Sequence, residues 1–132
     1  MESSIKVLSQ YRLERAKEDL KAANINHENG MYKAALNRAY YAIFHAMRAV
    51  VVLDGFDSSK HSGIIAFFNQ HYVKEGIFDR EMSKMLAKSQ LYRERSDYSD
   101  FFEPTADDSA EQIKNAELFV SRVEQYLIQL DK

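Results

Sequence analysis

The sequence predicts an all-α protein, an antiparallel bundle of four to five helices that run up and down. Only four glycines and one proline occur in 132 residues, so few positions favour turns or break helices. Apolar residues recur at helical spacing over long segments, and no strand-like alternation of apolar and polar residues is present. The 45% hydrophobic and 29% charged content is typical of a globular protein, and the length suits one domain over residues 1–132.

The first two helices are predicted over residues 4–27 and 31–53. The first carries apolar residues every three to five positions, namely Leu8, Leu13, Ala16, Leu20 and Ala23. It is expected to end at Asn29-Gly30, since glycine readily takes the left-handed conformation that closes a helix. The second is apolar on nearly every side, which indicates a central helix, and Asp54-Gly55 ends it.

Three more helices follow. Ser58 or Ser59 is expected to cap the third, which ends at Gly76, and Asp79 is expected to cap the fourth. Residues 96–104 are predicted to form a loop. Thr105 and the acidic residue three positions later resemble a capping box at the start of the last helix. That helix has the most regular apolar stripe, formed by Ile113, Ala116, Val120, Val123, Leu127 and Leu130.

Composition excludes several classes of protein. The absence of cysteine excludes disulfides, thiolate metal sites and a cysteine nucleophile. No His-Glu-x-x-His or paired Glu-x-x-His motif occurs, so neither a metal nor a cofactor is expected. The net charge of -2 gives no overall attraction to nucleic acid. The start of the chain does not resemble a signal peptide, and residues 39–53 are too short and polar to span a membrane, so we expect a cytoplasmic protein.

A polar stripe runs along the otherwise apolar second helix. At about 100° per residue, its members fall within an arc of roughly 100°. They are Asn37, Arg38, Tyr41, His45 and Arg48. Burying arginine and histidine is unfavourable unless they are paired or face a groove, so the stripe is either a seam between helices or a site.

A second candidate region lies near the end of the fourth helix. Arg93 and Arg95 could hold a phosphate through bidentate hydrogen bonds. His45, on the second helix, has the side chain suited to acid–base chemistry near neutral pH.

The alternative to a site is purely structural. In that interpretation, Arg38 or Arg48 pairs with Asp97 or Asp100 across the bundle, and tyrosines complete the network.

Three separated blocks resemble the HEPN family, the nucleotide-binding domains shared by higher eukaryotes and prokaryotes. The first block is Tyr32-x-x-Ala35-Leu36-Asn37-Arg38-Ala39-Tyr40-Tyr41-Ala42-Ile43-Phe44-His45-Ala46. The second is Lys60-His61-Ser62-Gly63-Ile64-Ile65-Ala66-Phe67-Phe68-Asn69, followed by Gly76-x-Phe78-Asp79. The third is Arg93-x-x-x-Asp97-Tyr98-x-Asp100-Phe101. The blocks occur in family order over residues 5–130, and the small stand-alone UPF0332-type proteins are the most similar branch.

The resemblance implies a four- or five-helix bundle that forms homodimers and is encoded beside a minimal nucleotidyltransferase as a toxin–antitoxin pair. Active family members are metal-independent endoribonucleases with an Arg-x(4–6)-His motif. Here Arg93 occupies the arginine position, and Tyr98 stands where the histidine is expected. A tyrosine of ordinary pKa is protonated at neutral pH and is a poor base. The one literal match to the spacing, Arg38 to His45, lies in the second helix.

Three possible functions follow from this resemblance and from the tyrosine that replaces the motif histidine. The leading hypothesis is a homodimeric HEPN module with a degenerate Arg-x4-Tyr motif that binds nucleotide or RNA and partners a minimal nucleotidyltransferase. The alternatives are an active endoribonuclease toxin, with Arg93 and His45 as catalytic candidates, and a purely structural bundle. The predicted binding residues are Arg93, Arg95, Tyr98, Asp97, Arg38 and His45.

Overall fold

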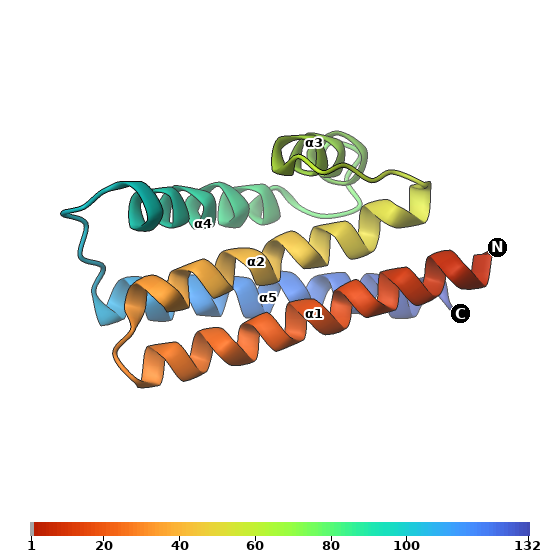
Figure 1. Cartoon of the computed structure of the whole chain (residues 1–132). Coiled ribbons are helices and arrows are strands. Elements are labelled where there is room, and N and C mark those ends of the chain that lie inside the picture. Colours follow the sequence, from red (N-terminus) through yellow and green to blue (C-terminus); the bar gives the residue numbers. More distant parts are fainter. Residues whose placement is uncertain (1) are drawn as a thin grey trace.

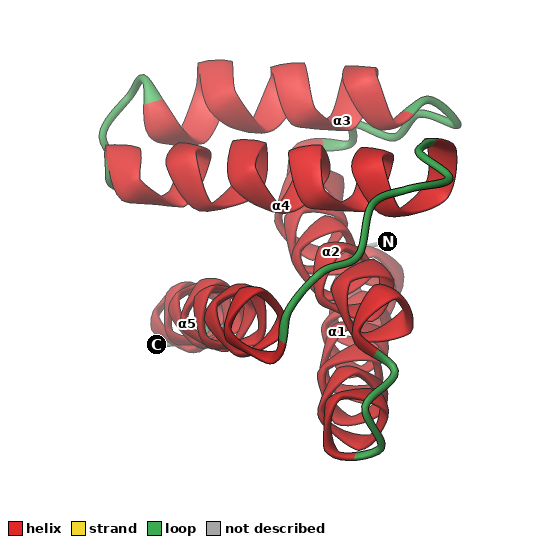
Figure 2. Cartoon of the chain, turned by 90° about the vertical axis from the view of Figure 1, so that its left-hand side faces the viewer, coloured by secondary structure: helices red, strands yellow, loops and turns green. Residues whose placement is uncertain are grey.

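A computed structural model of the protein describes the backbone of residues 2–132 and the side chains of residues 4–132. These residues form five α-helices and no strand, which confirms the predicted all-α class (Figures 1 and 2). The α-helices are α1 (Glu2–Glu28), α2 (Tyr32–Val51), α3 (His61–Phe68), α4 (Arg80–Tyr98) and α5 (Ala106–Leu130). A 3₁₀ turn, η1 (Val52–Asp54), follows α2, and a π-helical turn, η2 (Asn69–Val73), follows α3. Met1, which the predicted domain includes, lies outside the described residues.

Helix α2 is the centre of the bundle and packs against each of the other four α-helices, as its nearly all-apolar sequence predicts. Helix α3 is seen end-on in Figure 1. In Figure 2, α3 and α4 run across the view while α1, α2 and α5 are seen nearly end-on, so α3 and α4 both cross the other three helices. The labelled chain ends lie at the same end of the bundle (Figure 1).

A row of alanines allows the helices to approach α2 closely. Five of them, spaced alternately four and three residues apart, are fully buried: Ala35, Ala39, Ala42, Ala46 and Ala49. The helix α1, which makes the most extensive contact with α2, contributes two further fully buried alanines, Ala16 and Ala23. Because protein interiors are close-packed, a larger side chain at any of these positions would not fit unless the neighbouring helix moved away.

The predicted ends of α4 and α5 are partly confirmed. Thr105 and Asp108 form the predicted capping box of α5, with each side chain accepting from the other residue's backbone N–H. Asp79 is the N-cap residue of α4, but its carboxylate accepts from Arg122 of α5 at 2.6 Å and does not cap the helix. The predicted loop over residues 96–104 is confirmed for residues 99–104, but its start is wrong, because α4 continues to Tyr98.

The third helix also differs from its prediction. It begins at His61 after Lys60, so neither Ser58 nor Ser59 is its cap. The Ser58 hydroxyl instead accepts from the backbone N–H of Lys60 at 3.1 Å, which closes a local turn before the helix. After Phe68 the α-helix widens into the π-helical turn η2, so the predicted single helix is two segments.

Among residues 2–132, no helix combines the length and the apolar character that crossing a membrane requires.

Candidate functional site

Arg93, in the last turns of α4, lies close to the rings of two tyrosines of α2. Its guanidinium carbon is 4.8 Å from the ring centroid of Tyr40 and 5.9 Å from that of Tyr41. The Arg93 side chain is only 16% exposed, so water screens these cation–π contacts weakly. The two tyrosines follow one another in the predicted block of the second helix, and together they hold the arginine in one orientation.

His61, the first residue of α3, completes this group. Its Nδ1 lies 3.0 Å from the Tyr40 hydroxyl and 3.4 Å from Nη1 of Arg93. A guanidinium can only donate hydrogen bonds, so Nδ1 is the acceptor and the ring is neutral, with its proton on Nε2. Burial, then the positive charges of Arg93 and Arg48, lowers the pKa of His61.

The outer side of Arg93 faces an open hollow of about 490 Å³ at the end of α4. It is lined by Leu91, Arg93, Glu94, Arg95, Tyr98 and Ser99. Asp97 approaches Nε of Arg93 to 3.3 Å, but the geometry makes no hydrogen bond and leaves Nε a buried donor without an acceptor. Tyr98 is 78% exposed at the rim. The structure therefore brings four predicted residues, Arg93, Arg95, Asp97 and Tyr98, to one place.

Arg38 and His45 belong to a different group. Arg38 donates to the buried Asp19 of α1 at 2.9 Å and to Asn37 at 2.8 Å. Nε2 of His45 is 3.6 Å from the other Asp19 oxygen, which has no hydrogen-bond partner. Burial, together with the nearby arginines, lowers the pKa of His45 to about 4. The predicted structural pairing of Arg38 with Asp97 or Asp100 is wrong, because Asp19 takes that place.

Arg48 forms a third group with Arg12 of α1. Both arginines donate to the carboxylate of Asp57, at 3.3 Å and 2.8 Å respectively, which ties the segment before α3 to α1 and α2. Arg12 also reaches the backbone carbonyl of Arg48 at 3.4 Å. The arginines of the polar stripe are therefore paired in a seam between helices, which is one of the two predicted alternatives. The predicted partners of Arg48 are wrong, because it pairs with Asp57 and not with Asp97 or Asp100.

The ring of Tyr41 lies between the Arg38 group and the Arg93 group. Its ring centroid lies 5.0 Å from the Arg38 guanidinium carbon and 5.9 Å from that of Arg93. Arg38 thus borders the site through one aromatic ring, whereas His45 contacts Asp19 and not Arg93. No group of three or more histidine or carboxylate side chains within residues 4–132 is arranged to hold a metal ion.

Sequence reasoning missed two residues of this site. Tyr40 lies outside the predicted polar stripe of the second helix, although its hydroxyl is part of the polar group around Arg93. His61 is not among the binding residues predicted from the sequence, since it lies 32 positions from Arg93 and only the fold brings the two together. Its place in the block Lys60-His61-Ser62-Gly63 was the one available signal.

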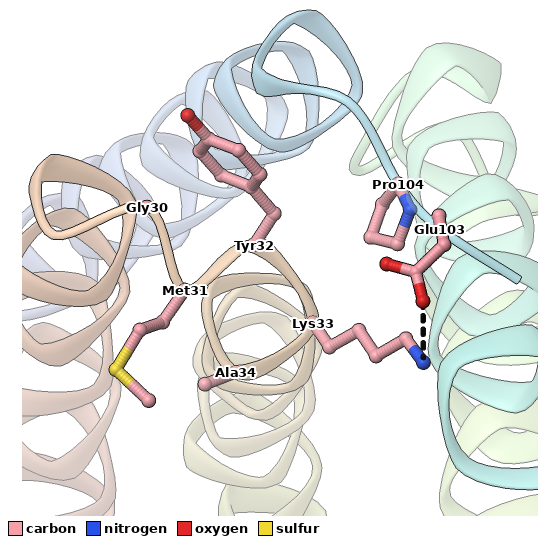
Figure 3. A pocket seen from close by; sticks show the side chains of 7 residues that line it. All are labelled: Gly30, Met31, Tyr32, Lys33, Ala34, Glu103 and Pro104. Atoms are coloured by element: carbon pink, nitrogen blue, oxygen red, sulfur yellow. Dashed lines mark ion pairs between the residues drawn. The ribbon is translucent and has the colours of Figure 1, made fainter.

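A second hollow, of about 360 Å³, lies between the α1–α2 turn and the segment before α5 (Figure 3). Its two charged side chains, Lys33 and Glu103, form an ion pair at 3.8 Å, drawn as a dashed line in Figure 3. Met31 points away from this pair (Figure 3). With its charges paired to one another, this hollow is less suited to a charged ligand than the one beside Arg93.

Comparison with known proteins gives the family. The model of the HEPN domain matches residues 9–126. The chain belongs to the HEPN family. The protein named "Putative toxin MJ0605" of Methanocaldococcus jannaschii is 36% identical over 115 residues, which cover 87% of this chain and 85% of that protein. A UPF0332 protein of Thermotoga maritima is 31% identical over 132 residues, which cover 100% and 99% of the two chains.

The fold agrees with a solved HEPN structure. The crystal structure of ST0689, an archaeal HEPN homologue, superposes with a TM-score of 0.64 at 17% identity, covering 90% of this chain and 97% of that one. The predicted resemblance to the HEPN family, including its UPF0332 proteins, is therefore confirmed. In this HEPN domain, the Arg93-x4-Tyr98 segment forms the end of α4 beside the open hollow.

Proposed function

We propose that this HEPN domain binds RNA or a nucleotide by a phosphate group at Arg93. The observation that carries the proposal is the guanidinium itself, held on two tyrosine rings with a buried Nε donor that lacks an acceptor. An orphaned donor of this kind is unfavourable unless a ligand satisfies it. Phosphate oxygens fit it well, since arginine donates to them in bidentate geometry.

The neighbours of Arg93 suit the rest of a nucleotide. Arg95 adds an exposed positive charge to the same hollow. Tyr98 offers an exposed ring on which an unpaired base can stack, a contact used by many proteins that bind single-stranded RNA. Asp97 weakens the attraction for an anion, and phosphate binding at Arg93 would displace its loose contact.

The proposed setting is a toxin–antitoxin pair in which the domain is a homodimer and partners a minimal nucleotidyltransferase. The name of the Methanocaldococcus jannaschii relative supports the toxin part of this proposal. Exposed apolar side chains support an interface at this end of α4. Leu91 and Tyr98 line the hollow, and Phe101 follows in the segment after the helix; all three are exposed. An interface at this end of α4 would bring a second copy or a partner next to Arg93.

A second candidate function is metal-independent cleavage of RNA. It is favoured by one observation, the contact between Arg93 and the neutral ring of His61. An arginine that stabilises negative charge and a histidine that moves protons are the two groups such a reaction needs. His45, the catalytic candidate that the sequence predicts, lies beside Asp19 and does not contact Arg93.

Binding is tested by fluorescence anisotropy with a labelled single-stranded RNA. We expect Arg93→Ala to weaken binding about tenfold to a hundredfold, the loss of one or two charge-assisted hydrogen bonds. The matched control is Arg80→Ala, which removes an exposed arginine from the first turn of the same helix. If both variants bind RNA as tightly as the unmodified protein, the proposed site is wrong.

Association is tested separately. Sedimentation equilibrium should give twice the chain mass, and Leu91→Glu with Phe101→Glu should shift the protein towards monomer. A nucleotidyltransferase encoded beside the gene should co-purify with the unmodified protein. A monomer that binds no such enzyme would contradict the proposed homodimer and the proposed nucleotidyltransferase partner. The phosphate site at Arg93 is tested independently, by the anisotropy experiment.

A further inference from the structure

We propose that a third hollow, between η2 and the end of α5, binds an organic cation such as a quaternary ammonium or a guanidinium group. It has a volume of about 420 Å³ and is lined by Asp54, Phe67, His71, Tyr72, Ile77 and Tyr126. Small-molecule sites in proteins have volumes of about 300–1,000 Å³, so the hollow is large enough for such a ligand. Among the described residues, no lysine or arginine lines it.

The hollow is far from the phosphate site proposed at Arg93. Tyr92, the residue before Arg93, bonds to Asp108 in the first turn of α5, whereas Tyr126 lies about five turns further along that helix, about 27 Å away. Figure 1 likewise shows the end of α5 beside the labelled chain ends and the end of α4 near the opposite end of the bundle. The two sites are therefore independent of one another.

Asp54, the last residue of η1, gives this hollow a negative charge. Its side chain is exposed and forms no ion pair with a cationic side chain of residues 4–132. Arg12 and Arg48 pair with Asp57 instead. The hydroxyl of Tyr72, a residue that is only 3% exposed, donates to Oδ2 of Asp54 and holds the carboxylate at the hollow. A carboxylate that is fixed but not neutralised attracts a positively charged ligand.

The two tyrosines beside Asp54 are kept neutral. Burial raises the pKa of Tyr126, and the charge of Asp54 raises it further. Burial also raises the pKa of Tyr72, and so does its hydrogen bond to Asp54. Both hydroxyls therefore stay protonated at neutral pH, and both rings are neutral aromatic surfaces.

Aromatic rings form most of the remaining wall. His71 packs on Phe67 with ring centroids 4.2 Å apart, and the rings of Tyr72 and Tyr126 meet at 83° with centroids 6.0 Å apart. Aromatic rings attract cations, and the attraction is stronger where water is displaced. A guanidinium group holds its water less tightly than a simple ammonium ion does. Weakly hydrated organic cations, including alkylated ammonium groups, are therefore the ligands that this wall favours.

A π-helical turn carries two of these side chains. In η2 the backbone N–H of Lys74 donates to the carbonyl of Asn69 at 2.8 Å, the wide spacing of a π-helix. Such turns are rare and frequently lie at functional sites. This one contains His71 and Tyr72, so the irregular turn coincides with the hollow.

The other two hollows suit a cation less well. The one at the end of α4 is lined by two arginines, Arg93 and Arg95. The one in Figure 3 has a carboxylate, Glu103, but Lys33 already pairs with it. The hollow at Asp54 differs from both, because it combines an unpaired carboxylate with aromatic walls.

A titration followed by nuclear magnetic resonance tests the site with defined probes. Choline carries the cation on a free small molecule, and N-acetylarginine methylamide presents it as a partner protein would. At about pH 8, where imidazoles are largely neutral, at least one of them should shift the amide signals of η2 and of the last turns of α5. We expect that shift to saturate with a Kd of about 0.1–10 mM.

The choice of probes separates the ligand sources. Tighter binding of choline would identify a free quaternary ammonium compound as the ligand class, and tighter binding of the arginine derivative would identify a side chain of a partner protein. Dimethylbutanol, in which carbon replaces the charged nitrogen of choline, should bind at least about tenfold more weakly than choline. Saturation by neither cation, or equal binding of the uncharged alcohol, would overturn the proposal.

Two variants test the residues. Asp54→Asn removes the charge but keeps an acceptor for the Tyr72 hydroxyl, and it should weaken binding of the cation at least about tenfold. Tyr126→Leu keeps an apolar side chain but removes the ring, and it should weaken binding about threefold to tenfold. The matched control is Glu75→Gln, which removes one charge from an exposed residue just after η2 that does not line the hollow. Thermal unfolding verifies that each variant folds.

The outcomes are specific to this site. If Glu75→Gln weakens binding as much as Asp54→Asn does, the attraction is a general effect of charge and the proposal is wrong. RNA binding should be the same in Asp54→Asn as in the unmodified protein, because Arg93 lies near the other end of the bundle. Failure of the cation site would therefore leave the proposed phosphate site untouched, and the reverse is also true.

Discussion

Asp19 of α1 and Arg38 of α2 form an ion pair of 2.9 Å in which only the arginine reaches the surface. The Asp19 side chain is 7% exposed, whereas that of Arg38 is 36% exposed. Burial raises the pKa of Asp19, and the positive charge of Arg38 opposes that rise. The stability of the pair therefore depends on the arginine, because a buried carboxylate without a cation is strongly unfavourable.

We predict that Arg38→Ala lowers the free energy of unfolding by about 1–3 kcal/mol, because it leaves the charge of Asp19 buried and unpaired. Arg93→Ala should be less destabilising, since Asp97, the carboxylate beside it, is partly exposed and can be solvated. Urea denaturation of the two variants measures the difference. Equal losses would mean that Asp19 does not depend on Arg38.

A double-mutant cycle isolates the pair. Asp19→Asn removes the buried charge, so adding Arg38→Ala to it should lower stability by less than Arg38→Ala does alone. The expected coupling is about 1 kcal/mol or more, since the residues touch. Additive losses would show that Arg38 stabilises the protein through its contact with the Tyr41 ring and not through Asp19.

The buried His45 should make stability depend on pH. Its pKa is about 4 in the folded protein and returns to about 6.5 on unfolding, so the unfolded chain binds more protons between these values. Stability should therefore be complete above about pH 6.5 and decline as the pH falls towards 4, by up to about 3 kcal/mol. At the low end, Asp19 acts in the opposite direction because its pKa is raised.

His45→Gln tests this dependence, since glutamine fills a similar volume and does not titrate. Urea denaturation from about pH 7.5 down to about pH 5 should give a flatter profile for the variant than for the unmodified protein. Parallel profiles would mean that folding does not change the pKa of His45. A contribution of the opposite sign would mean that His45 is protonated in the folded state and paired with Asp19, whose carboxylate oxygen lies 3.6 Å from Nε2.

More of the fold than of the site could be predicted from the sequence, because helix ends and caps depend on residues that are close together in the chain. The glycines at 30 and 55 close helices with positive φ, and the Thr105–Asp108 box depends on residues three apart. The polar stripe likewise showed that Arg38 needs a partner. Choosing Asp19 over Asp97 requires knowing how α1 is rotated against α2, which no local pattern contains. The meeting of His61 with Arg93 depends on how α3 crosses the bundle, so it could not be predicted either.

The alanine row of α2 predicts sensitivity to larger side chains. Ala42→Leu should destabilise the protein by about 1–3 kcal/mol or more, because Ala42 is fully buried and the added atoms force the helices apart. The control is Ala34→Leu on the same helix, at a partly exposed position that borders the hollow of Figure 3. Thermal unfolding should show a large loss for the first variant and little for the second.

The capping box of α5 predicts a graded effect at Thr105. Thr105→Ala should lower the free energy of unfolding by about 1 kcal/mol, since the backbone N–H of Asp108 loses its acceptor at 3.1 Å. Thr105→Ser keeps the hydroxyl and should be close to neutral.

The Asp108 carboxylate also accepts from Tyr92 of α4 at 3.1 Å, so the cap is linked to the helix that carries Arg93. Hydrogen exchange should therefore report faster opening at the start of α5 and around Tyr92 in Thr105→Ala. Faster exchange restricted to α5 would show that the two helices open independently.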